Sequence, residues 1–182
     1  TAAALTVVEP TSNGIGSDAF AIVWVDGKLH GLNASGPAPQ EATIEALKAL
    51  GHDTVPNHGM LPVTVPGAPA AWAALSERFG KLPFAELLAP AIALAEEGFP
   101  VSPVIHQMWK DAFTNYSAYS EASFKPWFDT FAPEGRAPEA GELWRSEGHA
   151  KSLKAIADTH AKAFYEGELA EAIDAFSREH GG

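Results

Sequence analysis

The pattern of apolar and polar positions in the first third of the chain predicts one β-hairpin. Residues 19–25 form a continuous run of apolar side chains, which is typical of a strand covered on both faces. Asp26 and Gly27 follow, and this pair readily adopts the positive φ angles of a tight type I′ turn. Residues 28–33 then alternate between polar and apolar side chains, as expected for the returning strand.

Apolar residues recur at helical spacing along much of the remaining chain. Pro83 opens one of the predicted helices and Gly98 closes it, whereas Pro90 should kink this helix or split it in two. Residues 1–8 resemble the end of a buried helix or strand. The apolar stripes that predict the helices are Ile44, Leu47 and Leu50; Trp72, Leu75 and Phe79; Phe84, Leu87, Leu88, Ala91, Ile92 and Ala95; Leu153, Ile156 and Ala157; and Leu169, Ala172, Ile173 and Phe176.

One hairpin and five or six helices do not make a standard layered domain. A strand that is apolar on both faces needs neighbouring strands, and the remaining sequence barely supplies them. We therefore expect the missing strands in sequence absent from this chain or in another chain. On this interpretation residues 1–182 are a single incomplete domain of the α+β class.

Residues 101–140 combine many aromatic side chains with loop-forming residues. These rings could line a binding wall, but a small cluster packed over a helix is the more common use of such side chains. We therefore expect a packed cluster here.

The charge balance excludes two classes of partner. The chain has 12 Lys and Arg against 23 Asp and Glu, a net charge of -11. Nucleic acids and anionic membrane surfaces both favour basic proteins, so we expect neither as a partner. The sequence contains no Cys, which excludes disulfides, thiolate metal sites and a Cys nucleophile within the chain. Periplasmic, secreted and cytoplasmic locations are all compatible with this composition.

No cluster of side chains in the sequence predicts a catalytic centre, a metal site or a cofactor. The seven His never fall four residues apart, as a helical metal pair would. The glycine loop at residues 13–18 precedes a strand, whereas a phosphate-binding loop follows a strand and opens a helix. Thr1 could act as an N-terminal nucleophile, but Ala2–Leu5 resembles a helix interior, so we assign Thr1 no catalytic role.

Read together, several short segments resemble the γ-glutamyltranspeptidase family of N-terminal nucleophile hydrolases. They follow the family's order and cover nearly the whole chain. The matching segments are Val7–Pro10, Gly14–Gly16, Leu32–Pro39, Val65–Gly67, Leu82–Ile92, Ala95–Val101, Ala163–Gly167 and Gly181–Gly182.

The resemblance implies a four-layer αββα fold shared by two subunits cut from one precursor. Residues 1–182 would be the mostly helical, N-terminal part of the large subunit, with one hairpin and without its partner strands. The family's nucleophile is a Thr at the new N-terminus of the small subunit, and its position lies beyond residue 182. The partners implied are the small subunit of the same precursor and a small-molecule γ-glutamyl or other amide. By the same reasoning this chain alone should be inactive.

One segment departs from the family pattern at the predicted substrate-binding residues, Asn33 and Ser35. Typical transpeptidases place an Arg at the position of Ser35, where it pairs with the α-carboxylate of the glutamyl group. A related acylase-like subgroup carries the Arg two residues later, and here that residue is Pro37. A buried carboxylate without a cationic partner costs a few kcal/mol, which weakens the prediction of a glutamyl substrate.

Three functions follow from these patterns. The first is a γ-glutamyltranspeptidase-like amidohydrolase or acyltransferase. The second is an acylase of the same fold that acts on non-glutamyl side-chain amides. The third is a non-catalytic helical interaction module, with the aromatic-rich residues 109–131 as its binding face.

Overall fold

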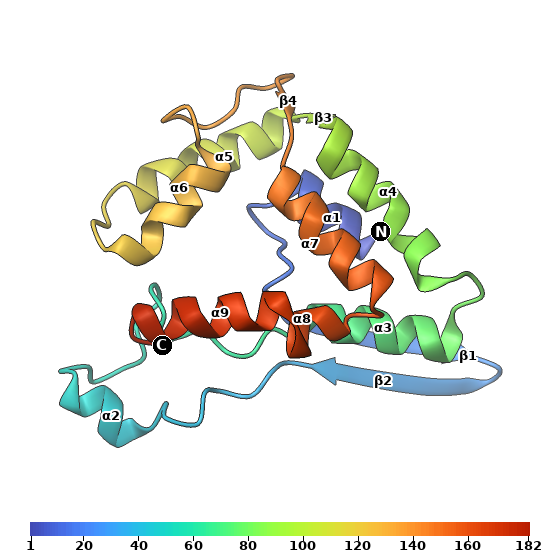
Figure 1. The fold of residues 1–182 in the computed structure, drawn as a ribbon, viewed down its shortest axis with the longest axis horizontal. Helices are drawn as coiled ribbons and strands as arrows, with labels where there is room; N and C mark the ends of the chain where they lie inside the picture. Colours follow the sequence, from blue (N-terminus) through green and yellow to red (C-terminus); the bar gives the residue numbers. More distant parts are fainter.

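The computed structural model describes residues 1–182 as nine α-helices, one short 3-10 helix and two small antiparallel sheets (Figure 1). None of the helices is both long enough and apolar enough to cross a lipid bilayer. In chain order the elements are α1 (Ala2–Val8), β1 (Ala19–Val25), β2 (Lys28–Ala34), α2 (Ile44–Ala49), α3 (Ala68–Phe79), α4 (Phe84–Glu97), β3 (Phe99–Pro100), α5 (Pro103–Tyr116), η1 (Ala122–Phe124), α6 (Lys125–Phe131), β4 (Leu143–Trp144), α7 (Glu147–Asp158), α8 (Lys162–Glu166) and α9 (Glu168–Glu179).

The predicted hairpin is present with the expected turn. Strands β1 and β2 pair antiparallel, with Ala19 opposite Ala34 at the open end. Asp26 and Gly27 form the turn with φ angles of 50° and 74°, the left-handed values that a type I′ turn requires. The local sequence therefore determines both the register and the tight reversal.

Residues 1–182 cover only one of the two faces of β1 that we expected to be buried. Helix α3 packs against one face of the hairpin. On the other face Phe20, Ile22 and Trp24 are 70%, 80% and 69% exposed. Figure 1 shows the hairpin at one edge of the molecule, where no element of this chain covers that face.

The main core lies between α1, α4 and α7. Helices α4 and α7 pack along each other, and α1 contacts α4. Val7, Ala95, Leu153 and Ile156 have no exposed surface, because the small Ala side chains of α4 let the helices approach closely. The structure also adds helices that the apolar stripes did not reveal, namely α5, η1, α6 and α8.

Pro90 does not split α4, contrary to one of the two outcomes predicted for it. The helix continues from Phe84 to Glu97 with Pro90 inside it. Pro90 is exposed, so the backbone carbonyl of Glu86 that loses its helical partner lies on the solvent side.

The aromatic residues of 101–140 form the packed cluster that we expected. Helix α5 carries Trp109 and Phe113, whose rings meet those of Phe131 and Phe128 on α6 edge to face at 5.9 and 5.8 Å. The indole N–H of Trp109 donates to the backbone carbonyl of Phe131 at 2.8 Å. The cluster therefore joins α5 to α6 as part of the fold.

A polar contact joins the buried faces of α1 and α7. The hydroxyl of Thr6 donates to the backbone carbonyl of Ala3 at 2.7 Å, and its oxygen lies 2.9 Å from Nε2 of His149. The single hydroxyl proton is used by Ala3, so Nε2 of His149 must be the donor in this pair. Burial lowers the pKa of His149 to about 4, which keeps the ring neutral at neutral pH.

We expect this His to make the protein less stable in mild acid. The pKa of His149 in the folded protein lies below the ordinary value of 6.5. Between pH 6.5 and about 4 the unfolded chain therefore binds a proton at this residue, whereas the folded chain does not. The contribution of neutral His149 to the free energy of unfolding should be fully present above pH 6.5. It should fall by on the order of 3 kcal/mol as the pH drops to about 4. Urea unfolding across this range would measure the loss.

The variant His149→Gln should lack most of that acid-dependent loss, since an amide N–H can also donate to Thr6 without titrating. His52→Gln is the matched control, because the side chain of His52 makes no hydrogen bond and only its backbone N–H is bonded, to the carbonyl of Leu47. An equal loss in His149→Gln and in the unmodified protein would contradict the assignment.

Candidate functional site

The two predicted substrate-binding residues, Asn33 and Ser35, lie where β2 ends, and the structure brings them into contact. The side-chain oxygen of Asn33 accepts the backbone N–H of Ser35 at 2.9 Å, which shapes the turn out of the strand. Both residues are exposed. Asn33 is opposite Phe20 in the strand register, so it lies on the uncovered face of the hairpin. We call residues 33–37 the strand-end loop.

A second stretch of backbone, Val65–Gly67, crosses this loop at very close range. A Cβ atom on Gly36 would lie 1.6 Å from the carbonyl oxygen of Val65, and one on Gly67 would lie 1.8 Å from that of Ala34. Neither glycine has a left-handed φ angle. Both glycines are therefore required for space and not for conformation. We call Val65–Gly67 the crossing segment.

Backbone hydrogen bonds fix the crossing segment in place. The N–H of Val65 donates to the carbonyl of Pro37 at 3.0 Å, and the N–H of Gly67 donates to the carbonyl of Ser17 at 3.1 Å. The crossing segment is thus bonded both to the strand-end loop and to the residues that lead into β1.

The strand-end loop has an acidic neighbour and no basic one. The carboxylate of Asp18 accepts the backbone N–H of Gly36 at 3.4 Å. No Lys or Arg side chain makes a hydrogen bond or ion pair with residues 33–37. The structure therefore offers no cation here to replace the Arg that Ser35 and Pro37 lack.

Tyr165 on α8 holds the crossing segment and the start of α3 through two hydrogen bonds of its hydroxyl group. Its hydroxyl donates to the carbonyl of Pro66 at 2.7 Å and accepts the N–H of Ala70 at 3.1 Å. Burial raises the pKa of Tyr165, so the hydroxyl keeps its proton at neutral pH.

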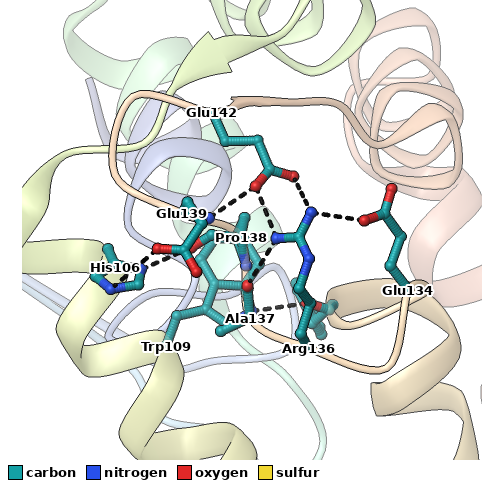
Figure 2. Close-up of polar contacts among 9 residues, drawn as sticks. His106, Trp109, Glu134, Arg136, Ala137, Pro138, Glu139 and Glu142 are labelled. Carbon is teal, nitrogen blue, oxygen red and sulfur yellow. Dashed lines mark hydrogen bonds and ion pairs between the residues drawn. The ribbon is translucent and has the colours of Figure 1, made fainter.

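The densest polar cluster of the chain lies elsewhere and is structural. Arg136 bonds Glu142 and Glu134 at 2.8 and 2.6 Å, and His106 bonds the carbonyl of Pro138 at 2.8 Å (Figure 2). The hydrogen bond from Arg136 holds the pKa of Glu142 below its ordinary value. Because these charged groups are paired with one another, the cluster holds the loop between α6 and β4 against α5 and presents no open catalytic pair.

The remaining candidates from the sequence are not brought together into a site. No group of three or more His, Asp or Glu is placed to hold a metal ion. The ring of His58 packs against Tyr119, with centroids 5.2 Å apart. Thr1 is exposed at the start of α1.

Sequence reasoning placed Asn33 and Ser35 correctly at the strand end but missed what holds them. Asp18, the crossing segment and Tyr165 are far apart in sequence, so no local pattern joins them to the loop. The signal that could have found the crossing segment and Tyr165 was their presence in the Val65–Gly67 and Ala163–Gly167 segments of the family resemblance, whereas Asp18 lies two residues beyond the Gly14–Gly16 segment.

Comparison with known proteins shows the family of the chain. The family model described as Gamma-glutamyltranspeptidase matches residues 1–182. An oxamate amidohydrolase proenzyme of Klebsiella pneumoniae is 36% identical over 180 residues, which cover 94% of this chain and 33% of the relative. A glutathione hydrolase-like proenzyme of Bacillus subtilis is 31% identical over 182 residues, which cover 98% of this chain and 33% of the relative.

Solved structures give the same result for the fold. The chain matches a cephalosporin acylase from Bacillus halodurans with a TM-score of 0.97 and 57% identity, over all of this chain and 34% of that one. It matches the γ-glutamyltranspeptidase of Helicobacter pylori with a TM-score of 0.88 and 30% identity, over all of this chain and 52% of that one.

The chain spans about a third of the length of the curated relatives that it matches. Its mixed architecture of helices with one small hairpin is that of the solved N-terminal nucleophile hydrolases, as the sequence predicted. The ordered motifs, the strand-end loop with its crossing segment and the whole-length match lead to one conclusion: the chain belongs to the γ-glutamyltranspeptidase family.

Proposed function

We propose that the whole protein is an amide hydrolase or acyltransferase, and that residues 1–182 supply its helical scaffold and one wall of the substrate pocket. The nucleophile would be a Thr outside this chain, as the family resemblance implies. The observation that carries the proposal is the strand-end loop, whose backbone is held by close crossing while the side chains of Asn33 and Ser35 stay exposed. Such a loop is rigid and open, as a pocket wall must be.

The open face of the hairpin supports a partner from the rest of the protein. Phe20, Ile22 and Trp24 lie on this face, and Leu29 on β2 is 64% exposed. Four large apolar side chains on one sheet face are unfavourable in water. We propose that the small subunit of the same precursor covers them, which would also place Asn33 at the subunit boundary.

The charges around the loop favour an acylase over a glutamyl-specific enzyme. A glutamyl group carries an α-carboxylate that needs a cation when it is buried. The only charged side chain bonded to the strand-end loop is the carboxylate of Asp18, which would repel that group. The 57% identity with a cephalosporin acylase adds weight to the same choice. We therefore propose that the acyl group of the substrate lacks an α-carboxylate.

The reaction would proceed through an acyl-enzyme. The hydroxyl oxygen of the Thr bonds to the amide carbon while its proton passes, through the free amine of the same Thr, to the departing nitrogen. The C–N bond breaks, and water or an acceptor amine then attacks the ester and restores the hydroxyl. In this scheme the side-chain N–H groups of Asn33 and the hydroxyl of Ser35 hydrogen-bond the acyl group without contributing charge.

The precursor should cleave itself. The intact mass of the full-length protein is expected to resolve into two fragments, the smaller beginning with Thr, and the processed form should hydrolyse amides. Residues 1–182 alone should give no turnover, because the nucleophile is elsewhere. A precursor that stays uncut and inactive would favour the helical interaction module instead, and turnover by residues 1–182 would return attention to Thr1.

Replacing Ser35 by Arg should shift the processed enzyme toward glutamyl substrates. Two anilides separate the alternatives, since 4-aminobutyryl anilide is γ-glutamyl anilide without its α-carboxylate. We expect the unmodified enzyme to tolerate loss of the carboxylate. Ser35→Arg should raise kcat/KM for the γ-glutamyl anilide about tenfold, because a charge-assisted hydrogen bond contributes on the order of 1.5–3 kcal/mol.

Ser120→Arg is the matched control, as Ser120 is an exposed residue outside the loop and the substitution adds the same charge. An unmodified enzyme that requires the α-carboxylate would contradict the acylase proposal and restore a glutamyl substrate.

A further inference from the structure

We propose that Tyr165 is a positioning residue for the substrate: its hydroxyl holds the crossing segment Val65–Gly67, which in turn fixes the backbone of the strand-end loop. Tyr165 itself makes no hydrogen bond to that loop. The assignment of the loop to the substrate rests on the proposed function. The mechanical link rests on contacts within this chain alone.

The first step of the link is the start of α3, which lacks a side-chain cap. Its N-cap is Gly67, and Pro69 in the first turn has no N–H to donate. Ala68 donates its N–H to the carbonyl of Ser17 at 2.9 Å, which leaves the N–H of Ala70. The hydroxyl of Tyr165 accepts a hydrogen bond from that N–H, so this residue of α8 caps the N-terminus of α3.

The second step joins this cap to the crossing segment. The same hydroxyl donates its only proton to the carbonyl of Pro66. Tyr165 therefore fixes the distance between Pro66 and the first turn of α3 with one atom. Removing that atom frees both ends, because the N–H of Ala70 and the carbonyl of Pro66 have no other partner in the structure.

The third step transmits this position to the loop. Pro66 stands between Val65 and Gly67, and each of these touches the strand-end loop through the close approaches to Gly36 and Ala34. The backbones of the crossing segment and the strand-end loop are too closely packed to move independently, so a displacement of Pro66 must move the loop. The exposed side chains of Asn33 and Ser35 would then shift with it.

The turn before α8 holds Tyr165 in its own place. His160 and Ala161 have φ angles of 51° and 68°, and Ala161 is buried. Two successive left-handed residues that are not glycine are costly and persist only where packing requires them. After the helix, a Cβ atom on Gly167 would lie 3.2 Å from the backbone of Ala163, which is a tight contact. Helix α8 is therefore a fixed support.

The test is Tyr165→Phe in the self-processed, full-length enzyme, assayed with the anilide that the unmodified enzyme cleaves best. Loss of the hydroxyl should raise KM about three- to tenfold, the range expected for one or two hydrogen bonds. The kcat should stay within about twofold, because the hydroxyl does not touch the reacting atoms. Tyr116→Phe is the control, since the hydroxyl of Tyr116 makes no hydrogen bond.

Hydrogen exchange gives a second readout that does not depend on activity. The proposal expects peptides that cover residues 33–37 to exchange faster in Tyr165→Phe and unchanged in Tyr116→Phe, in the precursor and in the processed enzyme. A lower melting temperature with no change in KM, or no change in exchange at residues 33–37, would reduce Tyr165 to a purely structural residue and overturn the proposal.

The two proposals fail in different ways. If the unmodified protein cleaves no amide, the proposed function is lost, and exchange at residues 33–37 alone decides whether Tyr165 positions the loop. If the unmodified protein is active but Tyr165→Phe matches it in both KM and exchange, only the role of Tyr165 is lost.

Discussion

The backbone crossing between the strand-end loop and the segment Val65–Gly67 is the constraint on which the candidate site depends. It requires glycine at positions 36 and 67, because a Cβ atom there would lie 1.6 or 1.8 Å from a carbonyl oxygen. It also sets the start of α3, which packs on the hairpin. One close contact thus connects strand end, loop and helix. Flexible residues around a substrate would otherwise have to be ordered at every binding event.

The same hairpin connects the chain to the rest of the protein. Its inner face lies on α3, whereas its outer face presents Phe20, Ile22 and Trp24. A sheet with one apolar face uncovered is incomplete, and in the proposed arrangement another part of the precursor completes it. Asn33 lies on that outer face, so the proposed substrate-binding wall and the proposed assembly surface would be continuous. Formation of the pocket would then depend on assembly of the subunits.

Charge decides which substrate the proposed site would accept. The members of this family that the chain resembles include amidohydrolases, acylases and glutathione hydrolases, so the fold does not select among them. In the proposed function, a few side chains at the strand end make that selection. Ser35 and Pro37 remove the expected cations, and Asp18 adds an anion beside Gly36. The proposed wall would therefore bind the acyl group by neutral hydrogen bonds.

The sequence alone determined the elements whose signals are local. The turn at Asp26 and Gly27, the amphipathic stripe of α7 and the family motifs all follow from neighbouring residues. It did not decide between a kink and a break at Pro90, because that depends on which side of the helix faces solvent. Only the tertiary structure joined Asp18 and Val65 to the strand-end loop and Tyr165 to the crossing segment. Their contacts are backbone approaches and single hydrogen bonds between distant residues, and these leave no periodic pattern in the chain.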